Sequence, residues 1–123
     1  IQLHIEEELE YRSAKDIFWV IFDNLILNSI QQNDSENILE IHVYVEKKER
    51  HLNIKYKDKG KGLPEKYKSS PMRIVEVHET SREKGHGIGM WIVNNTIVNT
   101  GGKILKIEGI NGFNIEFMIG DQL

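Results

Sequence analysis

The chain has 123 residues, of which 39% are hydrophobic and 28% are charged, a balance typical of a single folded domain. Its 16 Lys and Arg against 19 Asp and Glu give a net charge of −3, which argues against binding of duplex DNA through bulk charge. Cysteine is absent, so disulfides, thiolate zinc sites and cysteine nucleophiles are excluded, and the five histidines are too scattered to suggest a metal site.

No stretch of the sequence is long and apolar enough to cross a bilayer, and no secretory leader precedes the first predicted strand. We therefore expect a cytoplasmic domain that makes no membrane contact itself, while a longer parent protein could carry an anchor elsewhere. The first residue is Ile1, and the sequence opens directly in strand-like alternation. We interpret residues 1–123 as one domain taken from a longer protein.

A short strand and a long helix are predicted first. Apolar residues alternate over residues 1–5, which is typical of a strand. Ser13 is predicted to cap a helix that runs to about Gln32, with Asp16 completing a capping box. Trp19 lies in this helix and is expected in the core.

A hairpin follows the long helix. Apolar and polar residues alternate over 39–46 and again over 52–58, and Glu49-Arg50 is predicted as the turn between them. Alternation in the second strand places Asp58 on the same face as the apolar residues, so this carboxylate is expected to point inward at the strand end. An inward aspartate needs a partner.

The remaining sequence predicts short helical turns, a mobile polar loop, a helix and two closing strands. In chain order these elements are expected to start at Pro64 and then to span 71–77, 78–86, 87–100, 103–108 and 113–119. Gly101-Gly102 is predicted to cap the helix, and Asn111-Gly112 to turn the last hairpin. The order predicts a two-layer α+β sandwich, with a mixed, mostly antiparallel sheet of about five strands and about three helices on one face.

Three motifs suggest chemistry. Asn24 and Asn28 lie one turn apart on the long helix, with Gln31 three residues further, and such amides suit a hydrated magnesium ion with the phosphates it bridges. Alternatively, they satisfy backbone groups of a loop. The segment 58–62 is the second motif, because an inward carboxylate accepts an exocyclic amine and glycine admits a flat ring. An ordinary Asp-Gly turn is the alternative.

The third motif is Gly85-His86-Gly87-Ile88-Gly89-Met90, which opens a helix. Backbone N–H groups and the helix dipole at such a start can hold phosphates without a lysine. A flexible hinge is the alternative. The segment is not a dinucleotide fingerprint, because no strand precedes it, and it is not a P-loop, because no Lys-Ser or Lys-Thr follows.

In order and spacing, the three motifs resemble the GHKL ATP-binding superfamily, which includes gyrase, a heat-shock chaperone, histidine kinases and the MutL mismatch-repair proteins. The resemblance runs from Ser13 to about Ile119 and is closest to the catalytic, ATP-binding domain of sensor histidine kinases. Residues 24–31 are similar to their N-box, with Gln31 in place of Lys as in the nitrogen-regulation-type branch. Residues 74–90 line up without gaps on the lid and second glycine box of that branch.

The resemblance implies that the domain binds Mg-ATP. It implies that Asn28 coordinates Mg²⁺, with Asn24 and Gln31 beside it, and that Asp58 binds the adenine amine. The further nucleotide contacts that it implies are Gly60, Gly62, Leu63, Thr80, Ser81, Arg82, Gly85, His86, Gly87, Ile88, Gly89 and Met90. Two departures stand out: Val75, Val77, His78 and Glu79 replace the usual aromatics and proline of the lid, and Phe113 replaces a threonine near the adenine.

Hydrolysing relatives carry a glutamate one turn before the metal-binding asparagine, where this sequence has Asn24, an amide that cannot act as a base. The neighbouring Asp23 is a carboxylate, but it lies about 100° from Asn24 around the helix and is therefore expected to point elsewhere. We therefore expect transfer of the γ-phosphate to a histidine on a separate, upstream dimerisation domain, without which the isolated domain is inactive, and indirectly to a response regulator. The alternatives are a GHKL ATP switch or ATPase module and a scaffold that binds no nucleotide. Lysines at 55, 57, 59, 61, 66 and 68 are interpreted as a solvated face rather than a nucleic-acid site.

Overall fold

The structure, a computed structural model, describes residues 2–5, 16–33, 39–63, 65–75 and 86–120. Its helices are α1 (Ile17–Gln32), α2 (Glu65–Lys68), the 3-10 helix η1 (Pro71–Val75) and α3 (His86–Asn99). Its strands are β1 (Gln2–Ile5), β2 (Ile41–Lys48), β3 (His51–Asp58), β4 (Lys103–Glu108) and β5 (Asn114–Gly120).

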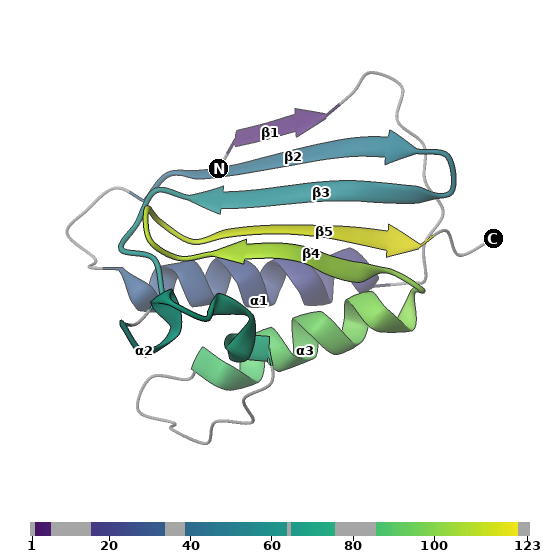
Figure 1. Cartoon of the computed structure of the whole chain (residues 1–123). Helices are drawn as coiled ribbons and strands as arrows, with labels where there is room; N and C mark the ends of the chain where they lie inside the picture. Colours follow the sequence, from purple (N-terminus) through teal and green to yellow (C-terminus); the bar gives the residue numbers. More distant parts are fainter. Residues whose placement is uncertain (1, 6–15, 34–38, 64, 76–85, 121–123) are drawn as a thin grey trace.

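The five strands form one sheet in the order β1-β2-β3-β5-β4 (Figure 1). The short strand β1 pairs in parallel with β2, and the other neighbours pair antiparallel. Strands β2 and β3 form the predicted hairpin, with Glu49 and Arg50 in the turn. The predicted two-layer α+β sandwich with a mixed, mostly antiparallel sheet is therefore confirmed.

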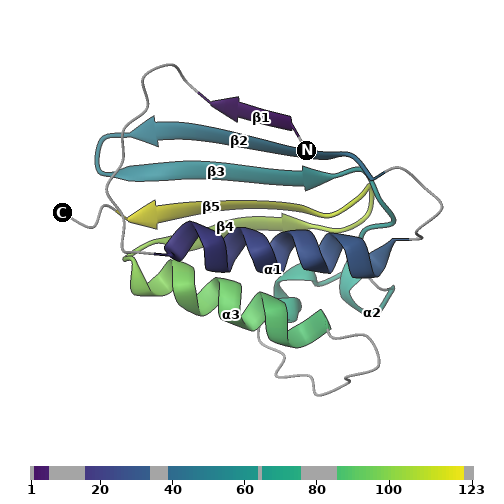
Figure 2. The ribbon, with the colours of Figure 1, turned by 180° about the vertical axis from the view of Figure 1, so that it is seen from behind.

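Helices α1 and α3 pack side by side against one face of this sheet (Figure 2). The core between the layers consists of apolar side chains from both helices and from the inward positions of the strands. Its largest fully buried members are Tyr56, Phe117, Ile21, Leu25, Leu52, Ile54, Ile74, Met90, Ile97, Ile115, Ile119 and Val93. None of the helices in the described part of the chain is long and apolar enough to span a membrane.

Helix α1 begins later than the sequence predicts. Its first residue is Ile17, and Asp16 precedes it with a left-handed backbone (φ 67°) and no capping bond from its side chain. Aspartate tolerates this conformation better than most residues, so Asp16 can stand outside helical geometry directly before the first helical residue. The predicted capping box is therefore not formed by Asp16, and Ser13 lies outside the described residues.

The prediction that Trp19 lies in the core is wrong, because this side chain is 74% exposed. Ile17, Ile21 and Leu25 recur every four residues and form the buried stripe of α1. Trp19 is two positions from that stripe, about 200° around the helix, and so faces away from the sheet.

The end of α3 is capped as predicted. Gly101 adopts a positive φ of 86°, and its N–H donates to the carbonyl of Val98 at 2.9 Å. The N–H of Gly102 donates to the carbonyl of Ile97 at 3.2 Å. These are the bonds by which a left-handed glycine ends a helix and turns the chain into the next strand.

Candidate functional site

Asp58 is the last residue of β3 and points into the interior, as predicted. Its exposed fraction is only 2%, because alternation along β3 places it on the same face as Ile54 and Tyr56. The Oδ1 atom accepts hydrogen bonds from the backbone N–H groups of Gly60, at 3.0 Å, and Phe113, at 2.9 Å. The Oδ2 atom accepts one from the hydroxyl of Ser29 on α1, at 2.7 Å. Three donors therefore hold this buried carboxylate.

The hydrogen bonds leave Asp58 one acceptor position. A carboxylate has about four lone-pair positions, two on each oxygen. Within the described residues, Oδ1 uses both of its positions and Oδ2 uses one. The remaining position of Oδ2 can accept one further N–H or O–H donor, which a ligand can supply.

The turn between β4 and β5 lies directly against Asp58. Gly112 has a φ of 86°, and a Cβ at this position would overlap the backbone carbonyl oxygen of Asp58. The adjacent Phe113 donates its N–H to the Asp58 carboxylate, and the N–H of Asp58 donates to the carbonyl of Phe113 at 2.9 Å. The predicted Asn111-Gly112 turn thus fixes the position of the carboxylate.

Gly112→Ala is expected to destabilise the domain by about 2 kcal/mol or more, because a left-handed alanine is strained and its methyl group meets the Asp58 carbonyl. Gly101→Ala is the matched control, since Gly101 has the same φ of 86° but no atom within 4 Å of a Cβ. Urea unfolding of both variants measures the difference. Equal losses of stability would contradict the close approach of Gly112 to Asp58.

Asn33 was assigned no role in the predicted site. Its side-chain amide donates to the carbonyl of Ser29 at 2.6 Å, and its Oδ1 accepts from the N–H of Lys61 at 2.8 Å. A Cβ on Gly60 would overlap the Asn33 side chain. Asn33 therefore ties the end of α1 to the loop after Asp58 and fills the space beside Gly60.

The predicted amides of α1 occupy different environments. Asn28 is 5% exposed, and its side chain makes no hydrogen bond to any residue that the structure describes. Asn24 donates to the carbonyl of Val20 at 2.7 Å, and its Oδ1 lies 3.4 Å from where a Cβ on Gly89 would stand. Gly89 thus lets α3 approach the polar side of α1.

The two glutamines at the end of α1 differ in burial. Gln31 is exposed. Gln32 lies four residues after Asn28 on the same side of the helix, and its Nε2 is buried without a partner among the described residues. Gln31 was predicted from its place in the motif, whereas Gln32 has the amide that needs a partner.

The described part of the third motif lies at the start of α3. This helix begins at His86, and the side chains of residues 86–88 are not described. Met90 is fully buried in the core, and Leu63 is buried against Gly109. The other predicted contacts, Thr80, Ser81, Arg82 and Gly85, lie outside the described residues. In Figure 1, the ends of β3 and α1 and the start of α3 lie at one end of the molecule.

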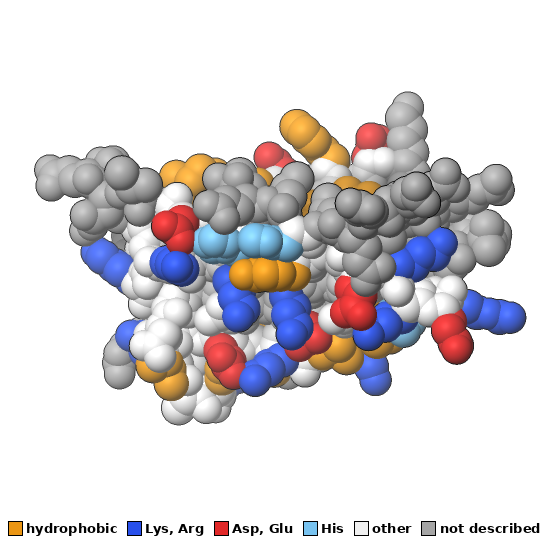
Figure 3. Space-filling model, turned by 90° about the horizontal axis from the view of Figure 1, so that it is seen from above, with side chains coloured by type: hydrophobic (Ala, Val, Ile, Leu, Met, Phe, Trp, Pro, Cys, Tyr) orange, Lys and Arg blue, Asp and Glu red, His pale blue; other side chains and the backbone are white. Residues whose placement is uncertain are grey.

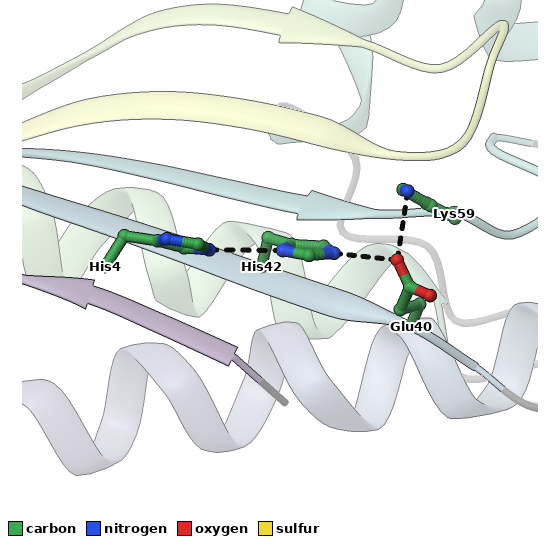
Figure 4. Close-up of polar contacts among 4 residues, drawn as sticks. All are labelled: His4, Glu40, His42 and Lys59. Atoms are coloured by element: carbon green, nitrogen blue, oxygen red, sulfur yellow. Dashed lines mark hydrogen bonds and ion pairs between the residues drawn. The ribbon is translucent and has the colours of Figure 1, made fainter.

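The face of the sheet opposite the helices carries a separate polar network (Figure 4). His4 on β1 contacts His42 on β2 through Nε2 and Nδ1, 3.2 Å apart, and its ring stacks on Tyr44 at 4.3 Å. The Nε2 of His42 lies 2.8 Å from Glu40, whose other partner is Lys59 at 3.0 Å. The His42 ring and the Lys59 ammonium lower the pKa of the Glu40 carboxyl. This network joins β1 to β2 and to the residue after Asp58.

The same face holds a shallow hollow of about 180 Å³ between β3, β4 and β5. Both acidic and basic side chains line it, and both kinds also occur on the face shown from above in Figure 3. Lys106, on its rim, pairs with Glu108 at 2.7 Å. Because Lys55 and Lys57 alternate with the inward Tyr56, the hollow lies on the side of the sheet away from Asp58. Among the described residues, no group of three His, Asp or Glu side chains could hold a metal ion.

Comparison with known protein families shows to which family this chain belongs. Residues 15–118 match the family described as "Histidine kinase-, DNA gyrase B-, and HSP90-like ATPase". The chain belongs to this family. The predicted GHKL resemblance is thus confirmed, and the assignment to the nitrogen-regulation-type branch stays a prediction.

Individual members of the family include histidine kinases. Over 84 residues, the chain is 33% identical to sporulation kinase A of Bacillus subtilis (strain 168), an alignment that covers 68% of this chain and 13% of the kinase. The chain therefore spans only a small part of that relative.

Solved structures share the fold. The catalytic domain of histidine kinase ThkA superposes with a TM-score of 0.75 at 23% identity, over 98% of this chain and 77% of that one. The mycobacterial sensor histidine kinase MprB superposes with a TM-score of 0.74 at 15% identity, over 98% and 80%. At these identities the likeness concerns the fold.

Proposed function

We propose that this domain binds Mg-ATP and presents the γ-phosphate to a histidine on a separate dimerisation domain, as the catalytic domain of a sensor histidine kinase. The observation that carries this proposal is the Asp58 carboxylate, which is buried, held by three donors and left with one acceptor position. Membership of the ATPase family and the kinases among its relatives support it. A domain that uses ATP in this way acts in the cytoplasm.

Adenine fits the acceptor position of Asp58. Its exocyclic amine donates a hydrogen bond, whereas guanine and hypoxanthine carry an oxygen acceptor at the same place, which would face the carboxylate. A buried site that hydrogen-bonds one donor rejects analogues that lack it, because the carboxylate is then left unpaired. We therefore expect Asp58 to select ATP over inosine triphosphate.

Asn28 fits the magnesium ion that the family implies. Magnesium is usually held by one or two protein oxygens together with the phosphates of the nucleotide, so a three-residue metal cluster is not required. Asn28 meets this need, since its side chain has no hydrogen bond within the described residues and the residue is only 5% exposed. It comes from α1, whose end lies at the same end of the molecule as the start of α3 (Figure 1). When bound, the ion would neutralise phosphate charge. The N–H groups at the start of α3 would bind the phosphates.

Transfer is favoured over hydrolysis because a base for water is missing from the polar side of α1. Asn24 is an amide, and its Nδ2 is committed to the carbonyl of Val20. Asp23 is exposed on α1, in agreement with the rotation expected from its sequence position. Without a base on this side of the helix, activation of water is weak, and the γ-phosphate remains available to an external nucleophile.

The test combines the 123-residue chain with the histidine-bearing dimerisation domain of its parent protein and radiolabelled Mg-ATP. We expect acid-labile, base-stable labelling of the dimerisation domain, from which a response regulator then takes the phosphoryl group, and little release of free phosphate by the chain alone. Steady ATP hydrolysis without a phosphohistidine would contradict the proposal and favour an ATP switch or ATPase module. Absence of ATP binding would favour a scaffold.

A further inference from the structure

A chain of buried hydroxyl groups ends on the acceptor oxygen of Asp58. The Oγ of Ser29 lies 2.7 Å from Oδ2 of Asp58 and 2.7 Å from the hydroxyl of Tyr56. The Tyr56 hydroxyl also lies 3.2 Å from the carbonyl oxygen of Leu25, one helical turn before Ser29. Tyr56 is 0% exposed and Ser29 is 2% exposed, so the chain is shielded from water.

The number of available protons determines which group donates in each hydrogen bond of this series of hydroxyls. An ionised carboxylate only accepts, so the single hydroxyl proton of Ser29 is donated to Asp58. The short contact between Ser29 and Tyr56 then requires the phenol to donate to Oγ, with the longer contact to the Leu25 carbonyl as a second branch of that bond. Burial, with the nearby Asp58 charge as a further cause, raises the pKa of the Tyr56 phenol, which keeps its proton in place. Both hydroxyls therefore donate toward Asp58.

We infer that Ser29 and Tyr56 are positioning residues for nucleotide selection. Ser29 occupies one lone-pair position of Asp58 Oδ2 and leaves the other for a single N–H donor of the base. Backbone groups already fix Oδ1, so the Ser29 bond decides how many positions Oδ2 offers. Tyr56 acts only through Ser29, because it makes no hydrogen bond to Asp58 itself. This inference rests on the proposed binding of ATP.

The experiment compares the Mg-dependent affinity of the 123-residue chain for ATP and for inosine triphosphate by calorimetry. Ser29→Ala is expected to lower the selectivity for ATP by about tenfold, since a hydrogen bond to a charged group is lost. Tyr56→Phe should lower it by about threefold, because Ser29 loses its donor but keeps its own bond. The double variant should equal Ser29→Ala alone, as expected when one residue acts through the other.

Ser69→Ala and Tyr44→Phe are the matched controls, since both residues are exposed and lie outside this chain of hydroxyls. Both should leave the selectivity unchanged, and urea unfolding verifies that every variant is folded. If Ser29→Ala does not fold, Tyr56→Phe, which keeps the buried ring, still tests the inference through its selectivity.

Three outcomes would overturn the inference. An equal loss of affinity for both nucleotides in Ser29→Ala would show a structural role alone, with the proposed function intact. Losses that multiply in the double variant would show that Tyr56 does not act through Ser29. If the unmodified chain bound neither nucleotide, the proposed function would fall first and the inference with it.

Discussion

Asp58→Asn is expected to weaken ATP binding by at least about 100-fold, because an amide N–H₂ would face the amine of adenine in place of an acceptor. The surroundings of the side chain determine which way the new amide turns. The N–H groups of Gly60 and Phe113 both donate to the Oδ1 position, so the amide oxygen must stay there. The N–H₂ group is therefore forced into the Oδ2 position.

The same substitution should leave the fold intact. The Ser29 hydroxyl can rotate so that it accepts a hydrogen bond from the new amide and donates one to the Tyr56 oxygen. The Tyr56 hydroxyl then donates its hydrogen bond to the Leu25 carbonyl alone. The two hydrogen bonds of Ser29, to residue 58 and to Tyr56, are thus kept with their directions reversed. Unlike a truncation to alanine, the change leaves no cavity, and the second N–H of the new amide occupies the position that Oδ2 of Asp58 leaves open, so loss of binding reports on recognition.

Calorimetry with ATP and inosine triphosphate measures this effect. Hypoxanthine presents an oxygen acceptor that the new N–H₂ group can meet, so the preference for ATP should vanish or reverse. Asp23→Asn is the matched control, since it makes the same change on the exposed side of α1. Unchanged affinity for ATP in Asp58→Asn would show that Asp58 does not bind the base.

Asn28→Ala should have the second largest effect, a loss of about tenfold in ATP affinity that appears only when magnesium is present. The reason is that the amide oxygen of Asn28 would be lost as a ligand of the ion, whereas the proposed contacts to the base, and those of α3 to the phosphates, would be unaffected. The side chain is buried and has no hydrogen bond within the described residues, so its removal breaks no internal bond there.

Titrations of Asn28→Ala with ATP in magnesium and in chelator separate the two possible roles. A loss of the same size under both conditions would mean that Asn28 only shapes the site. Asn99→Ala, at an exposed position at the end of α3, is the control for removing an asparagine from a helix. Thermal unfolding verifies that both variants are folded.

Alternation and helical periodicity predicted much of the fold. The alternation over residues 52–58 predicted that Asp58 points inward, because side chains in a strand alternate between two faces whichever strands pair with it. Gly101 predicted the cap of α3, and Gly112 predicted the turn between β4 and β5, because glycine adopts a positive φ readily. Both residues have a positive φ in the structure. These features depend on the local backbone and can be recognised without tertiary contacts.

Other features depend on contacts between distant segments. In the sequence, Asn33 has only the residue type that is common in turns. Its hydrogen bond with Lys61 forms only because the sheet brings the loop after β3 to the end of α1. Trp19 looked like a core residue by type, but its orientation follows from the stripe that α1 buries. The start of α1 was misplaced because Asp16 serves as a left-handed bend rather than as part of a capping box.

The inward aspartate follows from periodicity within one strand, and the layered fold follows from the order of strands and helices along the sequence. How that aspartate is held depends on tertiary contacts, because its donors come from α1, from the loop after β3 and from the turn before β5. A buried carboxylate must have its lone pairs satisfied, and the segments that satisfy them meet only after the sheet and the helices have packed.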